Sequence, residues 1–306
     1  MGGLKVVLWR TRSKFRIVTY HRFAPHFFPQ GPEILYEQCR FLKQSFEVLP
    51  LQEIARCLTS GAKIPDRALA VTIDDGYRDF LDYAFPVFQK TGIPATVFLI
   101  TGFLDRKLWP WWNQVEYATL HSRKRLVELP QQVFSLDDDA RRRQTSSALC
   151  EWLVKIPNSG RLAFLKRIPE LFEMEIPEEP PPQYAPMSWD EVRSLEQQGI
   201  EFGAHTETHP VLPSIEDRDQ LRAEILVSKA RVDAELGRPT RHFCYPNGDL
   251  NEATLQIVKE AGFETAVTTR AGLNDSHTER YRLMRLGLDP DSAGLYFREQ
   301  VLGLHA

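Results

Sequence analysis

Two adjacent carboxylates, Asp74 and Asp75, end an apolar stretch in the segment AVTIDDGYRDF, residues 70–80. Neighbouring side chains of a strand point to opposite faces, so the two leave in different directions unless the backbone turns at Gly76. Two ionised carboxylates held close together repel each other unless a cation, a hydrogen-bond donor or water compensates. The pair alone also fits an ordinary strand-to-loop turn, because Asp and Gly are common turn residues.

Two histidines further along the chain could bind a metal ion, which would be the missing cation. His205 and His209 stand four residues apart in HTETHP, and one helical turn after a strand would bring both imidazoles to one side. Two histidines and a carboxylate form a common transition-metal site, with coordination positions left open for water and substrate. A His-x-x-x-His pair is weak evidence by itself, and its place at the end of an expected strand favours a metal site.

Apolar segments rich in β-branched and aromatic residues predict buried strands separated by helices. The strands are expected at residues 15–21, 67–74, 94–100, 200–205, 241–246 and 264–269. Helical patterns cover residues 33–46, 78–91, 188–198, 216–236 and 250–261. This alternation predicts parallel strands with right-handed crossovers, and by itself it fits both a β/α barrel and an open doubly wound sheet.

The stretch between residues 105 and 186 breaks the alternation. It shows amphipathic helical patterns and then PEEPPPQYAP, whose prolines exclude a helix interior and favour a stiff, extended return. We interpret residues 105–186 as a helical insertion after the third strand, within one domain that spans residues 1–306.

Reactive side chains recur at the carboxyl ends of the expected strands. His21 ends the first, Asp74 and Asp75 the second, His205 the fourth and Tyr245 the fifth. In a parallel β/α barrel all these ends open onto one face, where active sites are built from the loops. A barrel would therefore gather residues that lie more than 200 positions apart.

Composition narrows the class of partner and the compartment. The 38 basic and 41 acidic residues give a net charge of −3, which provides no field for gathering nucleic acid or anionic lipid. The four cysteines are scattered without a CxxC pair, which predicts reduced thiols. No signal-type segment and no apolar run of about 18 residues is found, so we expect a cytoplasmic protein that acts on a small or neutral substrate.

Three motifs resemble one family. TIDDG (72–76) resembles the Thr-Phe-Asp-Asp-Gly motif of the polysaccharide deacetylase family, the NodB homology domain of carbohydrate esterase family 4. HTETHP resembles its His-Ser/Thr-x-x-His-Pro metal motif, and YPNGD (245–249) resembles its later Tyr-Pro-x-Gly segment. The resemblance implies a distorted (β/α) barrel of about seven strands.

Further segments are similar to a branch of that family that carries an insertion. They are YH (20–21), GIPATVFL (92–99), WPWWN (109–113) and MSWDEVRSLEQQGIEFGAHT (187–206). The resemblance extends from about Ile17 to about Leu286. It implies a hydrolase that removes N-acetyl or, less commonly, O-acetyl groups from amino sugars of a polysaccharide, oligosaccharide or glycoconjugate.

By resemblance, Asp75, His205 and His209 hold a divalent metal, with zinc as the first expectation and nickel or cobalt as alternatives. Asp74 is the general base, and the chemistry agrees, because a metal-bound carboxylate loses basicity and its free neighbour must take the proton from water. The backbone N–H of Tyr245 is expected to stabilise the tetrahedral oxyanion.

The general acid departs from the usual family pattern, in which a late Leu-x-x-His motif supplies a histidine. The late candidates here are His277, in an expected loop, and His305 near the end of the chain. A chain terminus is a poor place for a positioned acid. We therefore prefer His21, which ends the first strand beside a tyrosine as in the insertion-bearing branch.

An arginine that tunes the base aspartate is also displaced. His242 stands where the family often has that arginine, and Arg241, one residue away, would point to the opposite face of its strand. Arg285, in YRLMRLGL, resembles a Leu-x-Arg segment of the insertion-bearing branch. We expect Arg285 to contact Asp74.

Other assignments remain open at this stage. Trp109, Trp111 and Trp112 could stack on a sugar or pack between the insertion and the barrel. Alternative functions are an amidase of the same fold acting on a non-carbohydrate C–N bond, and a carbohydrate-binding protein with an inactive site. A two-histidine iron oxygenase is disfavoured, because its ligands usually include a His-x-Asp pair on an antiparallel barrel. The sequence does not set the oligomeric state.

Overall fold

The computed structural model describes residues 2–25, 29, 31–129 and 132–304, and its centre is one sheet whose strands all pair in parallel. The strand order is β10-β1-β3-β4-β7-β8-β9, with β2 beside β3. The strands are β1 (Arg16–Tyr20), β2 (Glu47–Val48), β3 (Ala68–Ile73), β4 (Ala95–Leu99), β7 (Glu201–Ala204), β8 (His242–Cys244), β9 (Thr265–Val267) and β10 (Leu286–Gly287). All six predicted strands are present, and the two that were not predicted, β2 and β10, are too short to leave a pattern.

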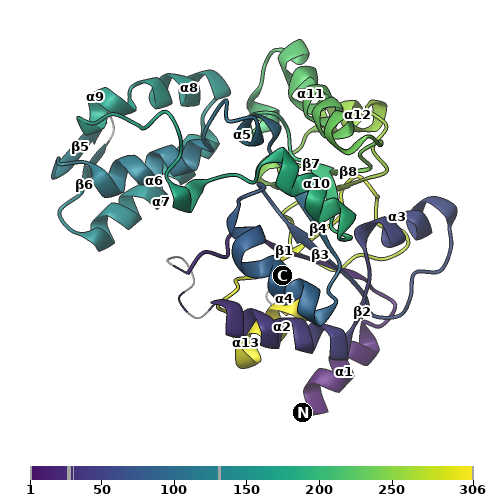
Figure 1. Ribbon diagram of the computed structural model, residues 1–306. Coiled ribbons are helices and arrows are strands. Elements are labelled where there is room, and N and C mark those ends of the chain that lie inside the picture. Colours follow the sequence, from purple (N-terminus) through teal and green to yellow (C-terminus); the bar gives the residue numbers. More distant parts are fainter. Residues whose placement is uncertain (1, 26–28, 30, 130–131, 305–306) are drawn as a thin grey trace.

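The sheet curls into a distorted barrel, which confirms the predicted fold class (Figure 1). Residues near the end of the chain bring its two edges together. Leu283 pairs in parallel with Val267 of β9, and Leu286 of β10 pairs with Val18 of β1. The open doubly wound sheet is therefore excluded, and the carboxyl ends of the strands face one mouth.

Helices surround the sheet, and the amphipathic ones among them bury one apolar face toward it. They are α1 (Gly2–Arg10), α2 (Gly31–Ser45), α3 (Leu51–Ser60), α4 (Phe85–Thr91), α5 (Thr101–Leu104), α10 (Trp189–Gln197), α11 (Arg218–Leu236), α12 (Glu252–Glu260) and α13 (Gly294–Leu302). The helix predicted at 78–91 divides into a π-helical turn, Phe80–Ala84, and α4. Ser188 and Glu191 form a capping box at the start of α10.

Residues 111–172, between β4 and β7, build a separate lobe, seen at the left of Figure 1. Its elements are α6 (Trp111–His121), β5 (Leu126–Leu129), β6 (Gln132–Ser135), α7 (Asp139–Lys155), α8 (Asn158–Lys166) and α9 (Ile168–Phe172). The lobe has its own apolar core, which includes Val115, Leu149 and Phe172. We refer to these elements as the insertion lobe.

The antiparallel hairpin β5–β6 corrects the prediction of an insertion without strands. Each strand has four residues, and each buries one side chain completely or nearly so, Val127 in β5 and Phe134 in β6. A single inward side chain per strand leaves no alternation in the sequence that could indicate a strand.

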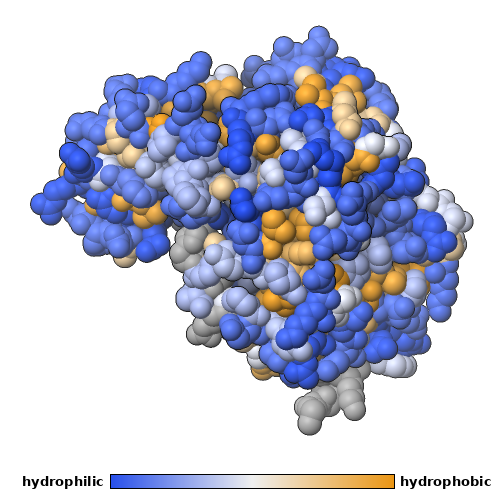
Figure 2. Space-filling view, in the orientation of Figure 1, coloured by the Kyte–Doolittle hydropathy of each residue, from blue (hydrophilic) through white to orange (hydrophobic). Residues whose placement is uncertain are grey.

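The surface view in Figure 2 shows hydrophilic side chains over most of the visible face of both the lobe and the barrel. None of the helices within the described ranges is long and apolar enough to cross a membrane. The four cysteines are free thiols, as predicted.

Candidate active site

The loop after β3 turns sharply to hold both carboxylates at the mouth of the barrel. Asp75 and Gly76 adopt left-handed backbone conformations, with φ of 77° and 83°. A Cβ at Gly76 would lie 3.0 Å from side-chain atoms of Leu99 and Leu104, and together with the positive φ this favours glycine there. Asp74 and Asp75 are only 2% and 4% exposed, and they therefore need compensating partners.

Asp75 meets both predicted histidines. The Nε2 atoms of His205 and His209 lie 3.6 and 3.9 Å from Asp75 Oδ1, and potential ligand atoms of the three residues all lie within 4.8 Å of one another. The predicted convergence is confirmed, but the predicted helical turn is wrong. Thr206 and His209 are left-handed, with φ of 66° and 55°, so the loop bends back on itself to bring the second imidazole inward.

The electrostatics of these three residues suit a cation. Burial lowers the pKa of His205 to about 4, and burial and then His205 lower the pKa of His209 well below its ordinary value. Both imidazoles are therefore neutral, as metal ligands must be. Burial and the neighbouring Asp74 raise the pKa of Asp75, because nothing nearby fully compensates its charge. Two neutral histidines and a carboxylate fit a divalent transition metal.

Asp74 has a different partner. Arg285 donates from Nη1 to Oδ1 at 2.8 Å and from Nη2 to Oδ2 at 2.7 Å, which confirms the predicted contact. Burial alone would raise the pKa of Asp74, but the guanidinium outweighs it and holds this pKa below its ordinary range. Arg241 instead pairs with Glu264 at the surface, as the one-residue offset in β8 predicts.

Cys244, which sequence reasoning did not assign to the site, also contacts the carboxylate of Asp74. Its Sγ lies 3.5 Å from Asp74 Oδ2 and accepts from Arg285 Nη2 at 3.2 Å. Burial raises the pKa of the thiol, so it stays protonated and can donate to the carboxylate. The signal in the sequence was its position at the carboxyl end of β8, beside Tyr245.

The prediction for Tyr245 needs correction. Its backbone N–H donates to the carbonyl of Val267 at 3.1 Å, and this bond between neighbouring strands leaves it unable to serve an oxyanion. Asn247, two residues on, lines the same pocket with a left-handed backbone (φ 55°). Its Nδ2 has no hydrogen-bond partner among the described residues.

His21 lies at the rim of the same pocket. Its Nε2 is 3.6 Å from Asp74 Oδ2, and its side chain is 48% exposed. Burial of one side of the ring lowers the pKa of His21. Asp74 acts in the opposite direction and raises this pKa, whereas Arg285 lowers it further. His277 lies in an exposed turn with Asp275, and His305 is outside the described residues.

These side chains line a pocket of about 490 Å³ whose opposite wall comes from the insertion lobe. Trp111 and Trp112 of α6 and Glu151 and Val154 of α7 form this wall. Two of the three tryptophans therefore face the pocket. Trp109 packs against Tyr117 and Tyr184 instead, with ring centroids 5.5 and 6.2 Å away.

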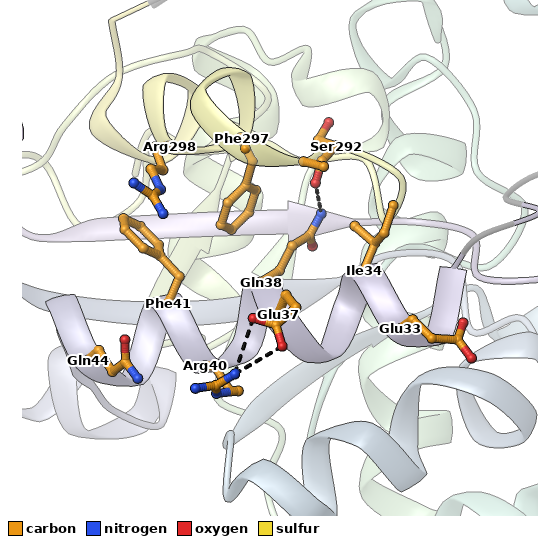
Figure 3. Close-up of a pocket in the computed structure, with 12 residues that line it drawn as sticks. Glu33, Ile34, Glu37, Gln38, Arg40, Phe41, Gln44, Ser292, Phe297 and Arg298 are labelled. Carbon is orange, nitrogen blue, oxygen red and sulfur yellow. Dashed lines mark hydrogen bonds and ion pairs between the residues drawn. The ribbon is translucent and has the colours of Figure 1, made fainter. Parts of the chain in front are cut away.

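A second hollow, of about 430 Å³, lies between α2 and α13 (Figure 3). Ile34, Gln38 and Phe41 of α2 point toward α13, which contributes Phe297 and Arg298 to the hollow. The described residues that line this hollow include no histidine or cysteine. The candidate metal-binding residues and Asp74 therefore lie together at the barrel mouth and not here.

The chain belongs to the polysaccharide deacetylase family, whose model matches residues 61–142 and 170–266, more than half of the sequence. The matched ranges contain Asp74 and the three residues of the candidate metal group, Asp75, His205 and His209. They leave out residues 143–169 of the insertion lobe, and also His21 and Arg285.

Particular relatives agree with this assignment. YxkH of Bacillus subtilis (strain 168), named after the same family, is 21% identical over 287 residues, covering 93% of this chain and 75% of that protein. The poly-beta-1,6-N-acetyl-D-glucosamine N-deacetylase of Escherichia coli (strain K12) is 27% identical over 111 residues, 31% of this chain and 16% of that protein. The Streptococcus pyogenes deacetylase PplD shares the fold, with a TM-score of 0.62, 19% identity and coverage of 94% and 96% of the two chains.

Proposed function

We propose that this protein is a metal-dependent hydrolase that removes N-acetyl groups from amino sugars of a glycan or glycoconjugate and releases acetate. The observation that carries the proposal is the convergence of Asp75, His205 and His209 beside Asp74, which a buried arginine holds ionised. The family supports deacetylation, and the E. coli relative is named for an N-acetylglucosamine polymer.

In this proposal Asp75, His205 and His209 hold the metal ion, for which zinc is the first candidate. A divalent cation supplies Lewis-acid polarisation of the acetyl carbonyl and a lowered pKa for water. Asp74 takes the proton from the attacking water, because its oxygens are ionised and Arg285 fixes their orientation. The two adjacent aspartates thus divide metal binding and proton transfer.

The remaining step, protonation of the leaving group, falls to His21. His21 is neutral at rest because its pKa is lowered, and it lies 3.6 Å from Asp74. It would receive the proton that Asp74 takes up and deliver it to the leaving amine nitrogen.

The substrate class follows from the pocket wall. Among the tryptophan and tyrosine rings that line the pocket, Trp112 is the one that is partly exposed, and it offers an apolar surface on which a sugar ring can stack. The rings of Trp111 and Tyr77 line the same pocket but are almost fully buried. The chain carries almost no net charge, so an uncharged acetylated amino sugar suits it better than a polyanion.

The experiment measures acetate release from N-acetylglucosamine oligomers, with N-acetylated amino acids as a parallel set of substrates. We expect release from the sugars only, its loss on chelation and its return on adding a divalent metal. Asp74→Asn should lower release by about 10²- to 10⁴-fold, and Asp66→Asn, at an exposed position, serves as the matched control. Activity that survives both chelation and Asp74→Asn would refute the mechanism, and release only from the amino acids would favour an amidase.

A further inference from the structure

The two histidines of the metal group are held in different ways. His205 Nδ1 bonds to the carbonyl of Cys244 at 2.8 Å, which fixes the ring and presents Nε2 to Asp75. His209 Nδ1 is buried and has no hydrogen-bond partner among the described residues. Metal-binding histidines almost always have this second nitrogen held by a carboxylate, a backbone carbonyl or water, and no acceptor from another described residue holds it at His209.

An aromatic side chain from the insertion lobe packs directly on that ring. The ring centroids of Trp112 and His209 are 4.5 Å apart, at an interplanar angle of 63°. On another side His209 meets the ring of His205, with centroids 4.6 Å apart. Thr206 Oγ1 accepts from the backbone N–H of His209 at 3.0 Å but leaves the side-chain torsions free. Packing therefore orients the imidazole.

Trp112 is itself fixed by the loop that carries the aspartates. Its Nε1 donates to the hydroxyl of Tyr77 at 3.0 Å, and that hydroxyl donates to Asn113 Oδ1 at 2.5 Å. Tyr77 is buried and follows Asp75 by two residues. The lobe thus touches the metal group at two points, at His209 through an aromatic ring and at the aspartate loop through a hydroxyl.

The end of the insertion adds backbone bonds to the same loop. Arg78 donates its N–H to the carbonyl of Ala185 at 2.9 Å, and Met187 donates to the carbonyl of Gly76 at 3.0 Å. Tyr77 and Pro186 form an isolated antiparallel bridge between them. Because the loop is bonded to both the start and the end of the insertion, its geometry depends on the lobe.

We propose that Trp112 is a positioning residue that holds His209 in its metal-binding orientation, and that the insertion lobe is a structural part of the metal centre. The inference rests on the metal site of the proposed function, but it is independent of the substrate. It assigns to the ring of Trp112 the task that a hydrogen-bond acceptor performs at His205. A tryptophan that only lined the pocket would affect substrate affinity and leave metal affinity unchanged.

The test measures the affinity of the purified protein for Zn²⁺ by competition with a chromogenic chelator, together with the visible spectrum of the Co²⁺-loaded protein. W112A should weaken Zn²⁺ binding about 10- to 100-fold, the range for lost outer-shell support, and should alter the Co²⁺ bands. W112F keeps an aromatic ring over His209 but loses the bond to Tyr77, so it should restore most of the affinity.

The matched control is W109F, in the same lobe. Trp109 Nε1 donates to the carbonyl of Glu178 at 3.2 Å and its ring packs against Tyr117 and Tyr184, so W109F loses a comparable bond while the ring that packs on His209 stays in place. We expect its Zn²⁺ affinity to equal that of the wild type. Should W112A fail to fold, W112L keeps apolar bulk without an aromatic face and is expected to show the same loss.

Wild-type affinity and an unchanged Co²⁺ spectrum in W112A or W112L would overturn the proposal, as would an equal loss in W109F. A wild-type protein that binds no Zn²⁺ would overturn it as well. Metal loss in W112A, in a protein whose wild type releases no acetate from any sugar, would uphold the positioning role and reject the proposed function.

Discussion

At the scale of single residues, adjacent Asp74 and Asp75 differ in their partners and hardly in their burial. Asp74 receives two hydrogen bonds from Arg285, which lower its pKa, whereas Asp75 faces two neutral imidazoles and has a raised pKa. A carboxylate in the second situation gains most from a cation. The roles are therefore separable by substitution.

Asp75→Asn and Asp74→Asn should differ in their effect on metal affinity, although both should impair acetate release. Asp75→Asn removes a ligand, so Zn²⁺ affinity and acetate release should both be lost. Asp74→Asn keeps the ligand set, and Zn²⁺ affinity should stay close to wild type while acetate release falls by about 10²- to 10⁴-fold. Chelator competition and an acetate assay on the same preparations check this, and equal metal loss in both variants would contradict the assignment.

Arg285 should be essential for stability as well as for the base. Replacing it in Arg285→Met leaves Asp74 buried and unpaired, which costs about 3–5 kcal/mol in the free energy of unfolding. Adding Asp74→Asn removes the unpaired charge, so the double variant should recover a large part of that loss. Urea unfolding of the wild type, both single variants and the double variant measures the coupling. Additive losses would mean that the pair is not coupled.

At the scale of elements, the histidine loop after β7 is held by the first residues of α5. The N–H groups of Thr101 and Gly102 donate to the carbonyls of Thr206 and Glu207, at 3.2 and 2.9 Å. This contact requires a close approach, because a Cβ on Gly102 would lie 2.7 Å from the carbonyl oxygen of Glu207. The position of both histidines therefore depends on the absence of one side chain.

Gly102→Ala should push the two segments apart. We expect a loss of about 1–3 kcal/mol in the free energy of unfolding, together with weaker Zn²⁺ binding, because the histidine loop moves with Glu207. Gly287→Ala is the control, since a Cβ there meets nothing within 4 Å. Thermal melts and chelator competition on both variants decide the matter, and equal effects would show that the close approach is unimportant.

Strand β8 carries a histidine whose burial should make the protein sensitive to acid. Burial, with smaller contributions from Arg241 and Arg238, lowers the pKa of His242 to about 3, and its Nδ1 lies 2.8 Å from Thr265 Oγ1. Between the ordinary pKa near 6.5 and about 3 the unfolded chain takes up a proton that the folded chain refuses. The neutral His242 therefore contributes fully to the free energy of unfolding above pH 6.5. This contribution is lost progressively as the pH falls from 6.5 to about 3.

His242→Gln should remove this contribution, so its unfolding free energy should fall less steeply than that of the wild type between pH 6.5 and 3. The difference in slope should approach about 1.4 kcal/mol per pH unit. Urea unfolding at several pH values measures it, with His121→Gln, at an exposed position, as the control. Parallel curves for His242→Gln and the wild type would contradict the expectation.

The elements that could be predicted from the sequence are those whose burial produces a recognisable pattern of apolar residues. Strands β1 and β3 are buried at every position, and their continuous apolar runs indicated them directly. The hairpin β5–β6 buries only one side chain per strand and left no such run. Likewise, the motif containing His205 and His209 indicated a metal site, but its left-handed turns come from tertiary contacts that no local pattern encodes.

At the scale of the whole molecule, the barrel gathers a site whose members are scattered over the chain. His21 follows the first strand and Arg285 precedes the last, and both lie outside the residues that the family model matches. The strand-end rule could predict that such residues converge. It could not predict that the backbone N–H of Tyr245 donates to the carbonyl of Val267 on the neighbouring strand. Nor could it predict that Trp112 of the insertion lobe packs on His209, because both contacts depend on long-range packing.

Because the ligands come from loops after β3 and β7, a bound metal should stabilise the entire fold. A ligand that binds only the native state adds RT ln(1 + [L]/Kd) to the free energy of unfolding, about 4 kcal/mol at 1,000 times Kd. The wild type should therefore melt several degrees higher with Zn²⁺ than with a chelator. Asp75→Asn should melt at the same temperature under both conditions. In the wild type the Asp75 carboxylate is the one that lies against both histidines. An equal rise in melting temperature in Asp75→Asn would therefore mean that the stabilising ion binds elsewhere.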